Sequence, residues 1–200
     1  MRSIDELIES AEELTNNGLS RGEIADELNI SRETAQWLVN QQGETGSSEG
    51  ATSSPTDVHI DWSAIGQNSH RMSHLGSIMA DIIPEPETIE LMIGVGNAGA
   101  RLATVISQEL GTKFSGYVPS KYQSDEDANS ETGSFSRNVA VVADMDCCIV
   151  DDNIDTGRTM AETIERLREN GCNPLSAVVL TDKHGEDKIN GVPVYSLIQM

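Results

Sequence analysis

The chain has 200 residues and a formal net charge of −20, because 33 Asp and Glu face only 13 Lys and Arg. No apolar run approaches the ~18 residues of a transmembrane helix, and the N-terminus lacks a basic-then-apolar signal pattern, so we expect a cytoplasmic protein with no membrane partner. The acids are spread over the whole length, which favours adaptation to molar intracellular salt, where a Debye length of about 3 Å weakens like-charge repulsion.

Three regions follow one another along the chain. Residues 1–42 have helical periodicity, residues 43–57 are rich in Gly, Ser and Thr without an apolar period, and residues 58–200 alternate strand-like runs with amphipathic helices. We therefore expect a small all-α domain, a flexible linker and a layered α/β domain.

The first region contains three predicted helices, over residues 4–16, 21–28 and 32–41. A serine precedes each of the last two predicted helices. Ser20 is followed three residues later by Glu23, which is the capping-box pattern. Ser31 is a suitable N-cap for the third helix.

The last two of these helices carry a specific apolar pattern, made by Ile24, Leu28, Ile30, Ala35 and Leu38. This pattern resembles the helix-turn-helix of transcription regulators, except that Asn29 stands where that family usually has a turn glycine. The resemblance implies a DNA partner, with the start of the second helix reading bases in the major groove. The implied DNA-binding residues are Ser31, Arg32, Glu33 and Gln36.

The acidity of this region leaves a second interpretation open, a small helical bundle for dimerisation or protein contact. Residues 1–42 hold nine acids and three arginines, whereas DNA-binding proteins ordinarily draw affinity from neutralising phosphates. In molar salt that contribution is small for any protein, so direct contacts carry more of the binding. We therefore retain the DNA-binding hypothesis.

The α/β region begins with a predicted helix over residues 63–82, which carries two histidines one turn apart. The i, i+4 spacing of His70 and His74 is compatible with a metal pair, but no third ligand is evident nearby. We therefore expect a solvated face and predict no metal site. The three cysteines also lack metal-ligand spacing, and we expect them to be reduced core residues.

A glycine turn joins the next predicted strand, residues 89–93, to a helix over residues 98–110. The sequence from Gly94 to Gly99 spells the G-x-G-x-x-G of dinucleotide-binding folds. The acid that holds the ribose in those folds is missing after the following strand, residues 113–118, although an NADH-binding redox sensor stays as a rival interpretation. A glycine turn at a helix N-terminus exposes backbone N–H groups to an anion.

Two adjacent acids end the strand predicted over residues 145–150. Asp151 and Asp152 suit sugar hydroxyls, or a Mg²⁺ that already carries a polyphosphate. The turn that follows opens a helix reaching about residue 170, and its N–H groups, hydroxyls and guanidinium can wrap a phosphate. That turn consists of Asp155, Thr156, Gly157, Arg158 and Thr159. Acids for a sugar beside donors for a phosphate indicate a phosphorylated ribose.

This region resembles the type I phosphoribosyltransferases, whose motif has four apolar residues, two acids, a variable pair and a Thr-Gly-x-Thr/Ser turn. Asp155 stands where the family commonly has Thr or Ser. The resemblance implies a parallel sheet flanked by helices, ribose hydroxyls held by the acids and a 5′-phosphate held by the turn. It also implies that the earlier glycine turn is a pyrophosphate loop, formed by Gly96, Asn97, Ala98 and Gly99.

A long polar stretch, residues 119–138, matches the flexible loop of that family. In the orotate branch, which this chain resembles most, the loop brings several basic residues over the pyrophosphate to stabilise charge on the leaving group. Here it offers Lys121 and Arg137 among four acids, and no histidine. Salt adaptation explains added acids but not missing bases, so we expect a disarmed domain without catalytic residues.

Together the two domains resemble the orotate-phosphoribosyltransferase-like transcription regulators of salt-loving archaea, which act on central sugar catabolism. The resemblance implies a homodimer that binds promoter DNA and senses a phosphorylated sugar or a phosphoribosyl-pyrophosphate-like effector. It implies no tightly bound cofactor, and Mg²⁺ only as a companion of the phosphorylated ligand. The alternative is an active orotate phosphoribosyltransferase of pyrimidine synthesis with a helical appendage.

Overall fold

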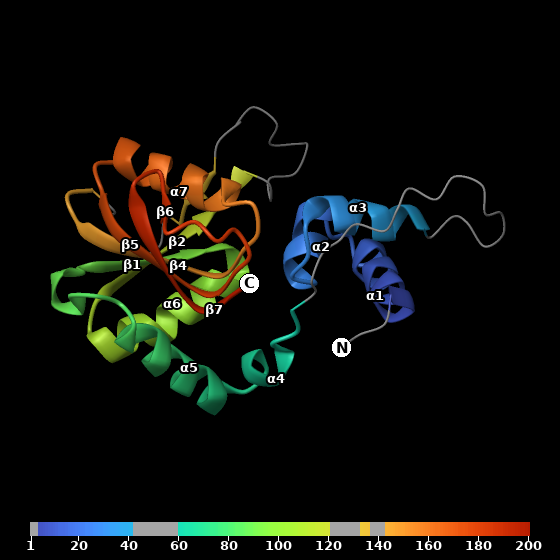
Figure 1. Ribbon diagram of the computed structural model, residues 1–200, viewed down its shortest axis with the longest axis horizontal. Helices are drawn as coiled ribbons and strands as arrows, with labels where there is room; N and C mark the ends of the chain where they lie inside the picture. Colours follow the sequence, from blue (N-terminus) through green and yellow to red (C-terminus); the bar gives the residue numbers. More distant parts are fainter. Residues whose placement is uncertain (1–3, 42–59, 121–132, 137–142) are drawn as a thin grey trace. The chain divides into compact units, whose positions relative to one another are not determined.

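The computed structural model describes residues 4–41, 60–120, 133–136 and 143–200. The chain divides into two compact units, Met1–Ser63 and Ala64–Met200 (Figure 1). The predicted linker, residues 43–57, lies outside the described residues. Within the described part of the chain, no helix is long and apolar enough to cross a membrane.

The N-terminal unit contains three helices, α1 (Ile4–Asn16), α2 (Arg21–Glu27) and α3 (Arg32–Gln41), which confirms the predicted helices. Ser20 caps α2 in a capping box: its hydroxyl accepts the Glu23 N–H at 3.4 Å, and its own N–H donates to Glu23 Oε2 at 2.7 Å. The core between the helices contains Ala11 and the whole predicted apolar pattern, Ile24, Leu28, Ile30, Ala35 and Leu38.

The turn between α2 and α3 depends on Asn29, whose φ of 52° lies in the left-handed region. Asparagine visits this conformation more readily than most residues because its short side chain can hydrogen-bond locally. Asn29 therefore adopts the conformation that a glycine usually provides in such a turn. The chain then re-enters the core at Ile30, whose N–H donates to Ala25 O at 2.9 Å.

The C-terminal unit is an α/β domain, as predicted. Its helices are α4 (Ser63–Gly66) at the unit boundary, α5 (Ser69–Asp81), the short 3-10 helix η1 (Pro86–Thr88), α6 (Gly96–Leu110) and α7 (Arg158–Glu169). Its strands are β1 (Leu91–Val95), β2 (Lys113–Val118), β3 (Ser134–Phe135), β4 (Asp146–Ile154), β5 (Asn173–Asp182), β6 (Lys188–Ile189) and β7 (Val192–Gln199).

The helix predicted over residues 63–82 is interrupted, so the prediction of one continuous helix was wrong. Asn68 adopts an extended conformation and caps α5, with its side-chain oxygen accepting the Arg71 N–H at 3.1 Å. Asparagine side chains compete with helical hydrogen bonding in this way, which favours them at helix starts over helix interiors.

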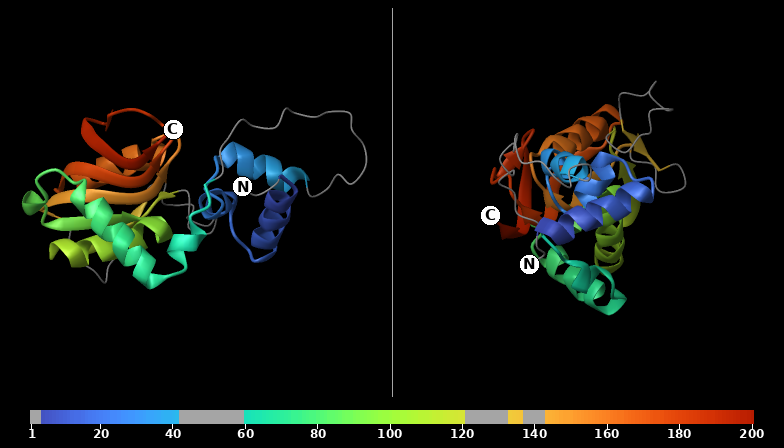
Figure 2. Two further views of the ribbon diagram at one scale, coloured as in Figure 1. Left: turned by 60° about the horizontal axis from the view of Figure 1, so that its bottom comes forward. Right: turned by 90° about the vertical axis from the view of Figure 1, so that its right-hand side faces the viewer.

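Within the described residues, seven strands form one sheet in the order β3-β2-β1-β4-β5-β7-β6. The five central strands are parallel, and the short edge strands β3 and β6 pair antiparallel with β2 and β7. Helices α5 and α6 cover one face, and α7 covers the other (Figures 1 and 2). The predicted fold class, a parallel sheet flanked by helices and preceded by a small helical region, is confirmed.

Two buried layers hold the sheet between its helices. On the face covered by α7, Ile93 and Ile149 belong to one core with Ile164 of that helix. Met92 and Cys148 point to the opposite face, because successive strand side chains alternate, and both are completely buried. A strand buried on both faces is a continuous apolar run, and this explains why β1 and the first half of β4 are recognisable in the sequence.

We predict that the thiols of Cys147 and Cys148 are unreactive in the folded protein. The cysteines are free and buried, as expected. Burial raises the pKa of Cys148 to about 12, and a hydrogen bond with Cys172, together with burial, raises the pKa of Cys147. Because the thiolate is the nucleophile, iodoacetamide at pH 8 should leave both unmodified in the native protein and label both after unfolding. Peptide mass spectrometry measures this, and rapid native labelling of Cys148 would contradict it.

Candidate functional site

The predicted site lies at the point of the sheet where the strand order reverses. After β1 the chain adds β2 on one side, and it later adds β4 on the other side, followed by β5. Loops that leave the carboxyl ends of β1 and β4 therefore diverge. Ligands of open parallel sheets bind in the crevice at such a switch point.

The two acids lie inside β4, and not after it as predicted, because pairing with β5 continues as far as Ile154 opposite Asp182. Asp151 is half-buried, and Asp152 is only 8 % exposed. The Asp152 N–H donates to Asp151 Oδ1 at 2.9 Å, which restricts the orientation of the Asp151 carboxylate. The hydroxyl of Thr181 on β5 donates to Asp152 O at 3.2 Å and fixes the backbone there.

The predicted pyrophosphate loop is the first turn of α6. This helix begins at Gly96, two residues earlier than predicted, so all four predicted loop residues, Gly96, Asn97, Ala98 and Gly99, lie in its first turn. The N–H groups of the first three of these, together with that of Val95, have no acceptor within the helix. Val95 is the N-cap and makes no side-chain capping bond. The positive end of the helix dipole and these N–H groups together favour an anion.

Two glycines bring this turn against β1 and β4. A Cβ on Gly94 would lie 2.4 Å from Ala100 Cα, so only glycine lets β1 approach the helix this closely. A Cβ on Gly99 would lie 2.5 Å from Val150 O and 3.2 Å from Asp151 Oδ1. The pyrophosphate loop and the first acid, which are separate motifs in the sequence, are therefore neighbours in the structure.

The predicted phosphate turn follows β4 and leads into α7. Gly157 has a φ of 73° and is the N-cap of α7, which begins two residues later than the predicted start near Thr156. Thr156 and Arg158 are exposed, while Asp155 and Thr159 are half-buried. The left-handed glycine gives α7 an N-terminus without a side-chain cap, so a phosphate can occupy the position that a capping side chain usually takes.

The carboxyl end of β5 adds residues that the sequence analysis did not identify. Asp182 is 3 % exposed and accepts the N–H groups of His184 at 2.8 Å and Gly185 at 3.2 Å. The imidazole of His184 lies beside the phosphate turn, because a Cβ on Gly157 would be 3.2 Å from its ring. In the sequence, the available signal was that Asp182 and His184 stand at the end of an apolar run. Parallel pairing with β4 brings this end of β5 to the same edge of the sheet as Asp151.

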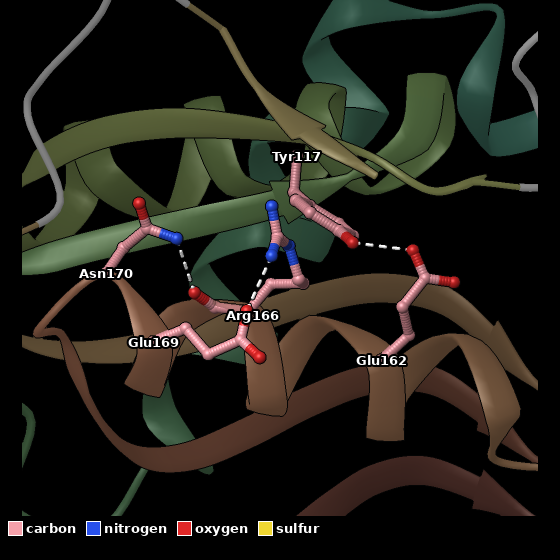
Figure 3. A network of polar contacts seen from close by, with 5 residues as sticks. All are labelled: Tyr117, Glu162, Arg166, Glu169 and Asn170. Carbon is pink, nitrogen blue, oxygen red and sulfur yellow. Dashed lines mark hydrogen bonds and ion pairs between the residues drawn. The ribbon is translucent and has the colours of Figure 1, made fainter. Parts of the chain in front are cut away.

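Glu162, on the second turn of α7, fixes the two ends of the segment between β2 and β3. Its carboxylate accepts the Tyr117 hydroxyl at 2.6 Å (Figure 3) and, from Ser120, the hydroxyl at 2.8 Å and the N–H at 2.9 Å. Burial alone would raise the pKa of Glu162, but these bonds and one from the Gly133 backbone lower it overall. Burial and the bond to Glu162 raise the pKa of Tyr117. We call these four residues the Glu162 cluster.

The remaining predicted residues lie either outside the described part of the chain or in the N-terminal unit. Lys121 lies outside the described residues, as does Arg137. In the N-terminal unit, Ser31 caps α3 by accepting the Thr34 N–H at 3.1 Å, and Arg21 Nη1 donates to Gln36 Oε1 at 2.9 Å. Arg32 and Glu33 form the first turn of α3.

No group of three or more His, Cys, Asp or Glu residues is arranged to hold a metal ion among the residues whose placement is described. The acids at the edge nevertheless provide oxygen atoms, the ligands that Mg²⁺ prefers when it arrives with substrate phosphates. A Mg²⁺ brought by a phosphorylated ligand is compatible with this arrangement.

Comparison with known proteins gives three consistent findings. Residues 61–197 match the family model described as phosphoribosyl transferase domain. Over its full length the chain is 50 % identical to transcriptional regulator GfcR of Haloarcula marismortui, of which it covers 96 %, and 50 % identical to that of Haloquadratum walsbyi, of which it covers 93 %. It is 40 % identical to transcriptional regulator GfcR of Methanosarcina mazei, of which it covers 98 %.

Two solved structures illustrate the shared fold. Adenine phosphoribosyltransferase from Thermoanaerobacter pseudethanolicus aligns with a TM-score of 0.59 and 16 % identity, over 74 % of this chain and 91 % of that one. Orotate phosphoribosyltransferase from Aeropyrum pernix aligns with a TM-score of 0.59 and 20 % identity, over 82 % and 92 %. At these identities the likeness concerns the fold alone.

We predict that Glu162→Gln costs about 1.5–3 kcal/mol of unfolding free energy at pH 7, the usual value of hydrogen bonds to a charged group. Because the folded pKa of Glu162 is lowered, this stabilisation is present above the unfolded pKa and is lost as the pH falls through the folded pKa. Urea unfolding in a double-mutant cycle with Tyr117→Phe measures the coupling, with Glu87→Gln as an exposed control. Additive costs would show that the hydrogen bond contributes nothing.

Proposed function

The chain belongs to the phosphoribosyltransferase domain family, in the group named transcriptional regulator GfcR, and on this premise we propose that it regulates transcription by sensing a phosphorylated metabolite. The coarse role follows from relatives that are 48–50 % identical over the whole chain and are named regulators, not enzymes. The metabolite, the DNA contacts, a homodimer, a cytoplasmic location and a link to central sugar catabolism belong to the proposal.

The observation that carries the sensing proposal is the convergence of two uncapped helix N-termini on one sheet edge. Helix α6 brings its first turn to Asp151, and α7 begins at the neighbouring phosphate turn. Two anion-binding helix starts flanking a carboxylate suit a ligand with a phosphate at one end, hydroxyls in the middle and a second anionic group. Phosphoribosyl pyrophosphate has this pattern, and ribose 5-phosphate has part of it.

The charge of the polar stretch argues against turnover. Transfer of a phosphoribosyl group needs cations over the departing pyrophosphate, because electrostatic stabilisation of the transition state is a large part of catalysis. Residues 119–138 offer two cations against four acids and no histidine. Binding to backbone N–H groups needs no such cations, so a ligand can be held without being converted.

The N-terminal unit is the proposed DNA-binding part. Its buried apolar pattern and the left-handed Asn29 support two helices joined by a tight turn. Ser31, Arg32 and Glu33 open α3, and Gln36 is oriented by its hydrogen bond from Arg21. In a homodimer the two copies of α3 would address two half-sites, and their spacing would respond to the ligand through differential affinity for two states.

We predict that Asp151→Asn/Asp152→Asn weakens binding of phosphoribosyl pyrophosphate with Mg²⁺ at least about 10-fold, since each change replaces a charged acceptor of ribose hydroxyls or of the Mg²⁺ that accompanies the ligand. Calorimetry in molar KCl measures this, with ribose 5-phosphate as a second ligand. Asp81→Asn/Glu87→Gln changes the net charge equally on exposed positions and serves as the matched control.

Addition of orotate to the same cell tests the alternative. Binding without pyrophosphate release supports a sensor, whereas Mg²⁺-dependent release would identify an orotate phosphoribosyltransferase. Equal binding by the wild type and the Asp151/Asp152 variant would contradict the proposed site, and binding of NADH would favour the redox-sensor interpretation.

We predict that Arg32→Ala and Gln36→Ala abolish selective enrichment of duplexes from a random DNA library in molar KCl. A lost base contact of this kind costs about 1–3 kcal/mol of discrimination. Lys188→Ala removes one positive charge from an exposed position in the other unit and should leave enrichment unchanged. Enrichment that survives both α3 substitutions would favour the alternative of a helical bundle for dimerisation or protein contact.

A further inference from the structure

We propose that His70 and His74 form a two-histidine chelate for a late first-row divalent cation, with Ni²⁺ as its probe. Both side chains are exposed on α5, and their Nε2 atoms lie 3.2 Å apart with ring centroids at 4.4 Å. This inference concerns a face of the C-terminal unit that the proposed phosphate site does not use, and it does not depend on that site.

The separation of the two nitrogens matches the requirement of a shared metal. Imidazole nitrogens bind such ions at about 2.0–2.1 Å. Two bonds of that length across 3.2 Å enclose an angle of about 100°, between the ~90° of octahedral and the ~109° of tetrahedral coordination. The separation of the two nitrogens is therefore already the one that a shared cation requires.

The hydrogen bond between the rings indicates which atom the cation replaces. At 3.2 Å one Nε2 must carry a proton and the other must accept it through its lone pair. When a cation takes the place of that proton, small rotations of the two rings turn both lone pairs toward one centre beside the line that joins the nitrogens. The contact between the rings therefore holds the two nitrogens at the separation that the cation needs.

Helix α5 is held firmly enough to keep this spacing. Asn68 caps its start, and Gly76 packs so closely on α6 that a Cβ there would lie 2.6 Å from Val105 Cγ2. Arg71, between the two histidines in sequence, donates through Nη1 to Ala64 O at 2.5 Å. Ser77, one turn further along, donates its hydroxyl to Glu109 at 3.1 Å.

The donor set selects the class of cation. Imidazole suits Ni²⁺, Cu²⁺ and Zn²⁺, whereas Mg²⁺ and Ca²⁺ prefer oxygen ligands. The described residues offer no third protein ligand, so water completes the coordination and the site is open. Sequence spacing alone favoured a solvated face for lack of that third ligand, but an open site does not require one.

Calorimetric titration with Ni²⁺ in molar KCl tests this proposal. Excess Mg²⁺ is present throughout to occupy oxygen-donor sites on the acidic surface. We expect one equivalent of Ni²⁺ to bind the wild type, and His70→Gln or His74→Gln to weaken the affinity at least 10-fold. Glutamine is a good helix former, so both variants should keep the helical circular dichroism of the wild type.

A matched control keeps two histidines on α5 but changes the number of residues between them. Ser69→His combined with His70→Gln places the histidines five residues apart, on different faces of α5, and should bind as weakly as the single variants. Thermal unfolding gives a second readout, because a cation that binds only the folded state raises its stability. We expect Ni²⁺ to raise the Tm of the wild type more than that of any variant.

Two results would overturn the chelate. One is equal Ni²⁺ affinity in the wild type and both single variants, which would assign the binding to carboxylates. The other is no binding by the wild type at millimolar Ni²⁺. Neither result bears on phosphoribosyl binding, which is measured with a different ligand and different variants.

Discussion

The candidate site depends on the backbone contact that Gly99 permits between α6 and β4. Any side chain at this position would meet Val150 O and Asp151 Oδ1, so the helix would have to move away from the sheet. With glycine, the first turn of α6 lies beside Asp151 within β4. Backbone donors and a carboxylate therefore lie next to each other, which neither motif provides by itself.

Features that depend on a few consecutive residues were predictable from the sequence. The capping box at Ser20, the left-handed turn at Asn29 and the glycine-to-helix transition at Gly96 all follow from local preferences. The apolar pattern of the N-terminal unit was equally informative, because the period of an amphipathic helix identifies its buried side. These signals were sufficient to predict the fold class and to identify the strands that lead into the candidate site.

Features that depend on pairing between distant segments were not predictable. The apolar run in the sequence ends at Val150, which predicts the end of the strand there. Pairing with β5 extends β4 beyond that point, so the two acids lie within the strand. His184 reaches the phosphate turn because β5 is parallel to β4. Glu162 reads as an ordinary exposed acid of an amphipathic helix, and only the structure shows it bonded to Tyr117 and Ser120. The break at Asn68 is different, because its signal is local: an asparagine favours a helix start over a helix interior.

A sensor and a transferase place different demands on the same crevice. A transferase must bind the transition state better than the substrate, which needs cations where the pyrophosphate departs. A sensor needs only a ligand that binds two states of the protein with different affinity. The helix starts of α6 and α7 lie on opposite faces of the sheet, so a ligand that spans them connects both layers. The Glu162 cluster continues that connection from α7 to the end of β2 and to Gly133, directly before β3, and neither step requires a catalytic cation.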